Sequence, residues 1–364
     1  MATISLEKLT KDYGNHKGIF DLDLIIDSGE FFVILGPSGC GKTTTLRIIA
    51  GLEYPDSGKV YLDGEDITDY PPRNRNMSMV FQNYALYPFM TVRENIAFPL
   101  KRMKVDKNEI DLKVEKMASI LSISNILDMK PGQISGGQRQ RVALGRAIVK
   151  EPKVFLMDEP LSNLDAKLRI GMRAELKKIQ MELKTTTVYV THDQIEAMTL
   201  ADRVVVMNNG NLEQLDRPMK IYEKPANSFI ASFLGDPPIN FLDAEVIKEG
   251  DQTFLVIGDG KIILNRNIGN YEGKFVRVGI RPEDIKITNS GIKSKITFIQ
   301  PLGRRRLEHF KITSDGTELI RASSEEQTLS VGDNCFIDFN HEKILLFVIL
   351  ISSGLMPTLT NLPS

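Results

Sequence analysis

The residues from Gly36 to Thr43 read GPSGCGKT, a glycine-rich spacing that could hold phosphate groups. The apolar run Phe31 to Leu35 predicts a buried strand before this loop, and a helix is predicted from about Lys42 to Ala50. Glycines let backbone N–H groups approach phosphate oxygens, because no Cβ stands in the way. Lys42 would place a positive charge at the β- and γ-phosphates, and Thr43 would offer its hydroxyl to Mg²⁺. The pattern predicts a nucleoside triphosphate site formed by Gly36, Pro37, Ser38, Gly39, Cys40, Gly41, Lys42, Thr43 and Thr44.

Two adjacent carboxylates, Asp158 and Glu159, follow the apolar run Val154 to Met157. In open α/β sheets, chemistry gathers at the carboxyl ends of strands. Mg²⁺ is a hard cation that keeps several waters, so Asp158 with the Thr43 hydroxyl and phosphate oxygens would suffice to hold it. Glu159 is expected to point elsewhere and to act as general base toward the attacking water.

A second turn of small residues, Ser135-Gly136-Gly137-Gln138, opens onto a predicted helix in ISGGQRQRVALGRA. The N-terminus of a helix presents unpaired N–H groups and a partial positive charge, so it binds phosphate. One phosphate loop and a second phosphate-binding helix start suggest a nucleotide that is held between two surfaces.

These motifs resemble those of the ABC ATPase family, whose signature is nearly reproduced here, with Ile134 where leucine is usual. The resemblance implies ATP as the nucleotide. It also implies that the signature of one subunit closes on the nucleotide of the other, so that the protein works as a homodimer. Asp165, in the segment SNLD, would belong to a loop that crosses this interface, and it is also expected to cap the helix that follows.

The same resemblance assigns three further residues. His192, in THDQIEAMTLADR, would hydrogen-bond the γ-phosphate and position the attacking water. Gln82, in MVFQNYALYP, would contact the metal and the water and sense a transmembrane partner. Tyr13, in KDYG, would stack on adenine. A capping or surface role for His192 and a packing role for Tyr13 are the alternatives.

Cys40 stands inside the phosphate loop, beside backbone amides and Lys42. These neighbours predict a lowered pKa for its thiol. Alkylation of Cys40 is then expected to block ATP hydrolysis, and bound nucleotide is expected to protect it.

The elements that must position these groups alternate between apolar strands and helices over the first two thirds of the chain, which predicts a mostly parallel sheet. Thr187 to Val190 reads as a further buried strand. Ile4 to Leu9 and Ile19 to Asp27 are predicted to be antiparallel edge strands, and residues 91 to 122 are predicted to be helical. The expected fold is an α/β ABC ATPase domain, in which a P-loop NTPase core carries an antiparallel β subdomain and a helical subdomain.

Gly235-Asp236-Pro237-Pro238 is the clearest break in the chain. Beyond it, short apolar runs separated by glycine turns predict a small β-barrel. The sequence therefore predicts an ATPase domain over 1–236, an OB-like regulatory β-barrel over 237–347 and an atypical tail over 348–364.

The composition excludes several classes of protein. A formal net charge of −1 over 364 residues gives no strongly basic surface, so no nucleic acid is expected as a partner. Two cysteines exclude a disulfide framework and fit a reducing cytosol. The longest apolar run, Ile344 to Ile351, is far shorter than the ~20 residues that span a bilayer. Any membrane association is expected through a partner.

Over almost its whole length, the chain resembles the ATPase subunits of bacterial sugar importers of the maltose and glycerol-phosphate type. IYEKPANSFIASFLGDPPINF and GIRPEDI carry this likeness beyond the ATPase motifs. The resemblance implies ATP-driven dimer closure coupled to two transmembrane permease subunits, with an extracytoplasmic solute-binding protein acting indirectly. Residues Tyr84 to Pro88 and the next helix would line the permease docking groove, and the C-terminal domain is a candidate site for a regulatory protein.

The chain departs from this pattern at Gln300, at the basic triplet Arg304 to Arg306 and in the tail after Phe347. Importers of polyamine, iron or sulfate use similar ATPases and stay as alternatives, as does a soluble ABC ATPase of DNA repair or translation. The soluble class is disfavoured because the chain has one P-loop. In addition, only 92 positions separate Thr43 from Ser135, and they contain no heptad run that would indicate an inserted coiled coil. A degenerate regulator that does not hydrolyse ATP is disfavoured by intact Lys42, Asp158, Glu159 and His192.

Overall fold

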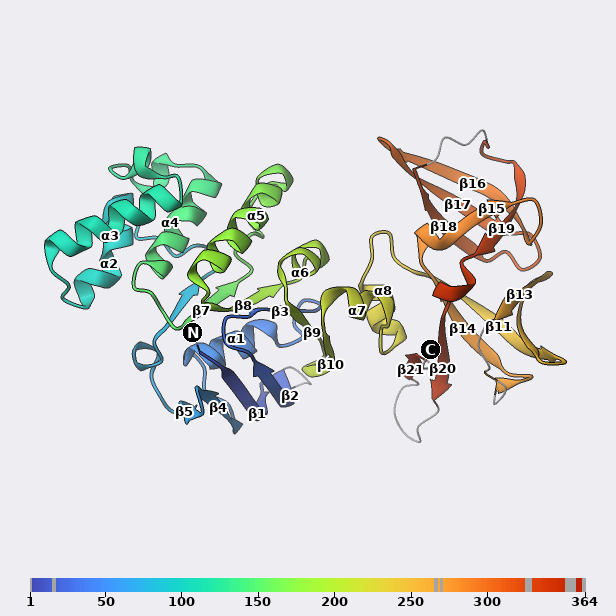
Figure 1. Cartoon of the computed structure of the whole chain (residues 1–364), viewed down its shortest axis with the longest axis horizontal. Coiled ribbons are helices and arrows are strands. Elements are labelled where there is room, and N and C mark those ends of the chain that lie inside the picture. The colour runs from blue at the N-terminus through green and yellow to red at the C-terminus, as the bar shows by residue number, and fades with distance from the viewer. Residues whose placement is uncertain are drawn as a thin grey trace. The chain divides into compact units, whose positions relative to one another are not determined.

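The computed structural model describes residues 2–14, 18–264, 268, 271–324, 329–350 and 358–361 (Figure 1). Its contacts divide the chain into two compact units, Met1–Pro218 and Met219–Ser364. This division falls before the boundary that the sequence predicts after residue 236. Helix α8 (Ser228–Phe233) and most of helix α7 (Pro218–Glu223) therefore belong to the second unit.

The first unit is built on a mixed sheet, which has six strands in the described residues. Its spatial order is β10-β9-β3-β8-β7-β6, with parallel pairs throughout except for the antiparallel pair of β10 and β9. Strands β3 and β8 are buried along their whole length, which explains their uninterrupted apolar or β-branched sequences. The bounds are β3 Phe31–Leu35, β6 Met77–Val80, β7 Val154–Asp158, β8 Thr186–Thr191, β9 Arg203–Asn208 and β10 Asn211–Asp216.

A separate antiparallel sheet has the order β2-β1-β4-β5 within the described part of the first unit. The predicted antiparallel pairing of the first two strands is confirmed. The prediction that both are edge strands is wrong for β1, because β4 pairs with its other side. The bounds are β1 Ile4–Asp12, β2 Gly18–Ile26, β4 Ser57–Leu62 and β5 Glu65–Asp66.

Three helices of the first unit begin where the sequence predicts them, at Lys42, after Ser135 and after Asp165, and a fourth predicted stretch is interrupted. Helix α1 spans Lys42–Ala50 as predicted. The stretch 91–122 is broken into two helices, because Lys104 adopts a left-handed φ of 60° and Asp106 caps a new helix by accepting from the Asn108 N–H. The bounds are α2 Val92–Arg102, α3 Lys107–Ile120, α4 Gly136–Ile148, α5 Ala166–Leu183 and α6 Gln194–Leu200, with short 3₁₀ turns η1 Pro72–Asn74, η2 Ser124–Ile126 and η3 Pro131–Gln133.

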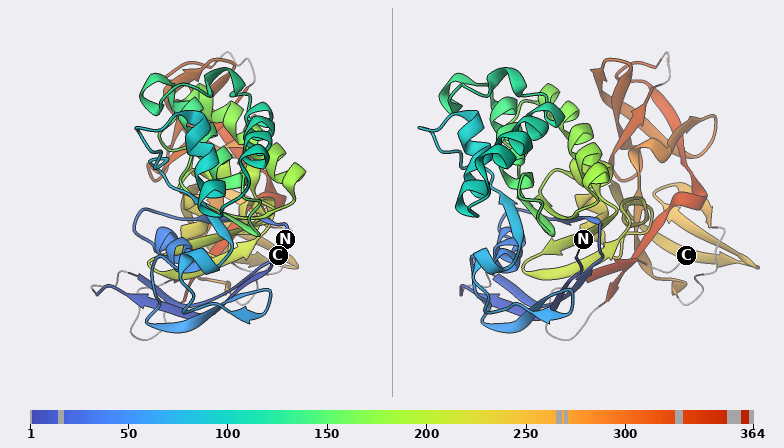
Figure 2. Two further views of the ribbon diagram at one scale, coloured as in Figure 1. Left: turned by 90° about the vertical axis from the view of Figure 1, so that its left-hand side faces the viewer. Right: turned by 60° about the vertical axis from the view of Figure 1, so that its left-hand side comes forward.

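Helix α2 packs on both α3 and α4, which forms a helical group. Figure 2 shows this teal-to-green group and the blue antiparallel sheet at opposite ends of the first unit in both views. The P-loop and the carboxyl ends of β7 and β8 belong to the mixed sheet that lies between them.

The second unit holds two antiparallel sheets, of which the described strands have the orders β13-β12-β11-β14-β20-β21 and β15-β19-β16-β17-β18. One apolar core contains residues of both sheets, Val278 and Phe310 among them. The predicted end of helical pattern beyond residue 236 is confirmed for the described residues, where only 3₁₀ turns occur, η5 Pro282–Asp284 and η6 His341–Lys343. The bounds are β11 Asn240–Glu249, β12 Gln252–Ile257, β13 Gly260–Leu264, β14 Phe275–Ile280, β15 Ile285–Thr288, β16 Ile292–Leu302, β17 Arg305–Ile312, β18 Glu318–Ser323, β19 Asn334–Phe339, β20 Leu345–Leu350 and β21 Thr358–Asn361.

Arg281 attaches the two short helices to this β-domain. Its buried guanidinium donates to the carbonyl oxygens of Ala231, Leu234 and Tyr222, and it lies 3.9 Å from the centroid of the Tyr222 ring. These contacts explain why the second unit begins near residue 219.

The tail that the sequence predicts as atypical, residues 348–364, is described only in part. Strand β21 pairs antiparallel with β20, from Phe347 opposite Asn361 to Leu350 opposite Thr358. Residues 351–357 and 362–364 lie outside the described residues.

Candidate nucleotide-binding site

The P-loop joins β3 to α1 and folds around its own lysine. Lys42 is only 5% exposed, and its Nζ donates to the carbonyl oxygens of Gly36 at 2.9 Å and Pro37 at 2.8 Å. Gly41 has a φ of 101°, and a Cβ there would lie 2.6 Å from the Gly18 carbonyl oxygen. The loop therefore needs glycine at position 41, both for its backbone angle and for the close approach of β2.

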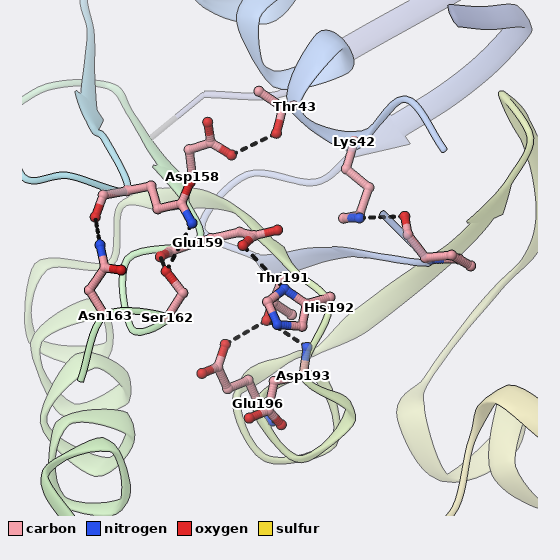
Figure 3. Close-up of polar contacts among 12 residues, drawn as sticks. Lys42, Thr43, Asp158, Glu159, Ser162, Asn163, Thr191, His192, Asp193 and Glu196 are labelled. Atoms are coloured by element: carbon pink, nitrogen blue, oxygen red, sulfur yellow. Dashed lines mark hydrogen bonds and ion pairs between the residues drawn. The ribbon is translucent and has the colours of Figure 1, made fainter. Parts of the chain in front are cut away.

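A hydroxyl and a carboxylate meet at the ends of α1 and β7. The Thr43 hydroxyl donates to Asp158 Oδ1 at 2.9 Å (Figure 3). Burial raises the pKa of the Asp158 carboxyl above its ordinary value, and the Thr43 hydrogen bond opposes this shift. The Thr43 hydroxyl oxygen and the partly buried Asp158 carboxylate are adjacent oxygen ligands of the kind that suits Mg²⁺. The residues present fit a magnesium ion at this position.

Glu159 and His192 form the second pair, at the ends of β7 and β8. Glu159 Oε2 lies 3.1 Å from His192 Nδ1. Glu159 has a left-handed φ of 43°, and its N–H donates to the Val190 carbonyl of β8 at 3.0 Å. This turn directs the Glu159 side chain toward His192, while Asp158 points toward Thr43, as Figure 3 shows. The prediction that Asp158 and Glu159 point in different directions is confirmed, and the left-handed backbone at Glu159 is the cause.

A buried network fixes the strand end that carries His192. The Thr191 hydroxyl donates to Glu196 Oε2 at 2.6 Å and accepts from the Asp193 N–H at 2.9 Å. The Tyr189 hydroxyl donates to the same Glu196 oxygen at 2.9 Å. Burial raises the pKa of the Glu196 carboxyl. The histidine side chain itself stays 54% exposed, with Glu159 in contact with Nδ1 of its ring, so it can be reached by a ligand.

Glu196 was not singled out from the sequence, although it lies in the quoted stretch THDQIEAMTLADR. Its position three residues after the helix cap Asp193 is a usable signal. A glutamate in a first helical turn is ordinarily exposed, so its burial against Tyr189 and Thr191 could only be seen in the fold.

Gln82 is joined to the loop that follows β7. Its Nε2 donates to the Ser162 hydroxyl at 3.3 Å, and Asn163 Nδ2 donates to the Gln82 carbonyl at 2.8 Å. The Ser162 hydroxyl in turn donates to the Glu159 carbonyl at 2.8 Å. Among the hydrogen bonds of the described residues, none joins Gln82 to Asp158. The predicted metal contact of Gln82 stays a prediction.

Ser135 begins helix α4, as the sequence predicts. Its hydroxyl accepts from the Gln138 N–H, and Gln138 Oε1 accepts from the Ser135 N–H, which forms a capping box. A Cβ on Gly136 or Gly137 would lie 3.6 Å from Leu164 or 3.7 Å from Leu168. The signature therefore lies against the segment after β7.

Asp165 caps helix α5 by accepting from the Leu168 N–H at 2.9 Å, so its predicted capping role is confirmed. Its role across a dimer interface stays a prediction. Tyr13 is 53% exposed, with Lys11 Nζ 5.7 Å from its ring centroid. The predicted P-loop tip, Ser38 and Gly39, is exposed, and Thr44 is half-buried on α1.

The predicted lowering of the Cys40 thiol pKa is wrong, whereas the predicted effect of its alkylation on ATP hydrolysis stays a prediction. The residue is only 3% exposed, and burial raises the pKa of its thiol, although the Lys42 charge and backbone hydrogen bonds act in the opposite direction. The thiol packs beside Gly36, where an added Cβ would lie 2.7 Å from Cys40 Sγ. The sequence shows the nearby positive groups but not that the thiol faces inward, and desolvation outweighs their effect.

A groove of about 430 Å³ lies beside the segment that follows Gln82. Its walls come from that segment, from α2 and from α4, with contributions from Ala85, Tyr87, Phe98, Pro99 and Arg146. Part of the predicted docking groove, namely Ala85, Tyr87 and residues of α2, therefore does line a common groove.

Comparisons with known proteins agree with this geometry. The ABC transporter family matches residues 19–162, and the MalK OB fold domain matches residues 235–285. The trehalose/maltose import ATP-binding protein MalK of Thermococcus litoralis is 46% identical over 368 residues, which cover 95% of this chain and 98% of that protein. The sn-glycerol-3-phosphate import ATP-binding protein UgpC of Bordetella avium is 48% identical over 338 residues, which cover 92% and 93%.

Two further similarities are to a mycobacterial relative and to a solved structure. The trehalose import ATP-binding protein SugC of Mycobacterium tuberculosis is 47% identical over 337 residues, covering 88% of this chain and 85% of that protein. The dimeric structure of MJ0796, a bacterial ABC transporter cassette, is 33% identical, with a TM-score of 0.53, and covers 59% of this chain and 98% of that one. No helix among the described residues has the length and apolar character needed to cross a membrane.

The predicted fold class is thereby confirmed: an ABC ATPase domain with a mixed sheet and an antiparallel subdomain is followed by an OB-fold β-domain. The phosphate loop joins β3 to α1, the two carboxylates lie at the end of β7, and the signature turn begins α4. Because identity near 46% extends over nearly the whole chain, the protein belongs to the MalK, UgpC and SugC family of ABC transporter ATP-binding subunits.

Proposed function

We propose that this chain is the ATP-hydrolysing subunit of an importer for a sugar or a glycerol phosphate. The observation that carries the proposal is the convergence of two pairs, Thr43 with Asp158 and Glu159 with His192, at one edge of the mixed sheet. The names of three relatives support the import role, since each is an import ATP-binding protein.

The geometry suggests a division of roles in hydrolysis. Lys42 and the loop N–H groups would hold the β- and γ-phosphates, and Thr43 with Asp158 would hold Mg²⁺. The ion, when bound, would offset the negative charge of the phosphates. Glu159 would take the proton of the attacking water, and His192 would orient the Glu159 carboxylate through the contact at 3.1 Å.

Several features favour a homodimer as the working form. In the described residues, no hydrogen bond or ion pair joins the signature, Ser135 to Gln138, to the P-loop of the same chain. Ser135 is exposed at the start of α4, and the N–H groups there would bind the nucleotide of a second copy. The related cassette MJ0796 was solved as a dimer. Asp165 would lie in the loop that crosses between the two copies.

The groove beside the Gln82 segment is the proposed docking place for two transmembrane permease subunits. Its walls include the exposed apolar side chains of Leu52 and Tyr87, which suit a short apolar helix. The chain would then be a peripheral subunit on the cytoplasmic side of the membrane. An extracytoplasmic solute-binding protein would act through the permeases, and the C-terminal domain would receive a regulatory protein.

A sugar or a glycerol phosphate is the proposed solute class because the relatives are named for trehalose/maltose, trehalose and glycerol-3-phosphate import. Polyamine, iron and sulfate import are the competing assignments, and a binding protein recovered with the complex would decide among them. Titration calorimetry of that binding protein with maltose, trehalose, glycerol 3-phosphate, spermidine, ferric ion and sulfate would identify the solute that it binds.

The decisive experiment is an affinity purification of tagged Glu159→Gln protein, with ATP, from detergent-solubilised membranes of its own cells. Loss of the base should hold the ATP-closed complex together, and mass spectrometry should find two permease subunits. Lys42→Ala protein is the matched control, because it should not close on ATP. Recovery of ribosomes or DNA repair proteins without a permease would overturn the importer assignment.

A further inference from the structure

Arg146, in the last turn of α4, reaches across to the segment from Gln82 to Tyr87, which we call the Gln82 loop. Its Nη1 donates to the Ala85 carbonyl oxygen at 2.7 Å, and its Nη2 donates to the Tyr84 carbonyl oxygen at 2.9 Å. The guanidinium carbon lies 5.3 Å from the centroid of the Tyr87 ring. One side chain of the signature helix thus binds three residues of the loop that carries Gln82.

The backbone at these two carbonyls is unusual. Tyr84 has a φ of 63° and Ala85 a φ of 46°, so two consecutive residues with a Cβ adopt the left-handed conformation. This conformation is unfavourable for L-residues, and a pair of them persists only when the surroundings hold it in place. The planar fork of an arginine presents two donors side by side, which suits two adjacent carbonyl oxygens.

Arg146 depends on the Gln82 loop just as the loop depends on Arg146. Burial lowers the pKa of Arg146, and no carboxylate of the described residues forms an ion pair with it. Its positive charge is instead offset by the two carbonyl dipoles and by the face of the Tyr87 ring. If the Gln82 loop moved away, the half-buried guanidinium would lose these partners, so the contact opposes separation of the loop from α4.

The Gln82 loop is fixed at its other positions as well. The buried Asn95 side chain accepts from the Tyr87 N–H at 2.9 Å and donates to the Tyr87 carbonyl at 3.1 Å. Gln82 bonds to Ser162 and Asn163, beside the catalytic Glu159. Arg146 lies between these two attachments, and it lines the same groove as Ala85 and Tyr87.

We propose that Arg146 is a positioning residue, which holds Tyr84 and Ala85 in their left-handed conformations and so places Gln82 for hydrolysis. A segment bound in the groove would contact this guanidinium and would act on the ATP site through it. The inference rests on the proposed function for the role of Gln82, whereas the control of the loop conformation by Arg146 stands independently.

The test compares Arg146→Lys with Arg141→Lys. Lysine keeps the charge and the stem but cannot donate to both carbonyls in the arginine geometry. Arg141 is the matched control, because it lies on the same helix and donates to the Leu121 carbonyl at 2.9 Å, away from the Gln82 loop. Hydrogen exchange read by mass spectrometry should show residues 82–87 exchanging at least about tenfold faster in Arg146→Lys, as expected when a hydrogen bond to a charged group is lost. Arg141→Lys should leave this segment unchanged.

The kinetic readout separates positioning from general damage. In Arg146→Lys, kcat for ATP should fall while KM for ATP stays within about twofold, since the P-loop is untouched. A second substitution, Ala85→Gly, should restore part of the kcat, because glycine adopts left-handed angles without a Cβ penalty.

A third variant covers the case in which Arg146→Lys does not fold. Ala85→Val adds strain at the left-handed position while Arg146 stays intact, and it should also speed exchange in residues 82–87. Unchanged exchange in this segment in both Arg146→Lys and Ala85→Val would overturn the proposal. So would a loss of kcat that Ala85→Gly fails to relieve. If the wild-type protein shows no hydrolysis, the proposed function fails, and the exchange measurements still decide the role of Arg146.

Discussion

Glu159 and His192 touch across two adjacent parallel strands, with Glu159 Oε2 at 3.1 Å from His192 Nδ1. The contact exists because Glu159 turns left-handed directly after β7 and because the buried Glu196 holds the end of β8. A carboxylate that is hydrogen-bonded to an imidazole is held in one orientation, which a general base needs.

Glu159→Gln should lower kcat for ATP hydrolysis by about 10²–10⁴-fold, since the amide cannot take a proton from water. ATP binding should persist, because Lys42 and the P-loop are unchanged. A phosphate-release assay and a nucleotide-binding titration would check both statements. Glu182→Gln, at an exposed position of α5, is the control with the same chemical change. Hydrolysis at the wild-type rate in Glu159→Gln would remove Glu159 from the mechanism.

Asp158→Asn should weaken Mg²⁺ binding in the presence of nucleotide at least about tenfold, since even outer partners of a metal contribute that much. Titration of the nucleotide-bound protein with Mg²⁺ would measure this. Because burial raises the pKa of Asp158, acidification should weaken Mg²⁺ binding at a higher pH than an ordinary aspartate would require.

Asp158→Asn should also increase the stability of the folded protein when no ligand is bound. A carboxyl whose pKa is raised by folding binds more protons in the native state, so it reduces stability as the pH rises through that range. Asp158→Asn removes this cost and should raise the Tm of the ligand-free protein at neutral pH, as read by scanning calorimetry. An unchanged or lower Tm would contradict the burial argument.

Native Cys40 should react slowly with iodoacetamide at neutral pH, and faster as the pH rises. Its thiol is buried and its raised pKa leaves little thiolate at neutral pH. Mass spectrometry of alkylated peptides at several pH values would measure the rate, with unfolded protein as the reference. Rapid modification of the native protein at pH 7 would restore the prediction made from the sequence.

Arg281→Met should destabilise the second unit by about 2–4 kcal/mol, because it leaves two buried carbonyl oxygens and one partly buried carbonyl oxygen of the α7–α8 segment without their donor. The measurement is unfolding in urea, together with proteolysis, which should begin to cut within residues 219–236. Arg277→Met is the control: this arginine is half-buried, pairs with the exposed Asp243, and its replacement should cost less than about 1 kcal/mol. Equal effects of the two substitutions would refute the anchoring role of Arg281.

Local features were predictable because they depend on residues close together in the chain. The glycine spacing and the preceding strand predict the P-loop and the start of α1 at Lys42, and the structure agrees. Ser135 and Asp165 cap their helices through residues three positions away. Apolar runs bounded by polar residues likewise predict β7 and β8, since a strand that is buried on both faces has no polar side to show.

Other features were decided by residues far apart in the sequence. Whether Cys40 faces a charged site or a dry interior depends on how β2 and β9 close over the loop, and the prediction made from its neighbours was wrong. Glu196 becomes a support for His192 only because β8 buries its hydroxyl partners. Arg146 meets Tyr84 and Ala85 across 62 and 61 positions of the chain. The types and spacing of residues therefore determined the chemistry that this protein can perform. Tertiary packing decided which groups are desolvated and which are paired, because both depend on contacts that no short segment contains.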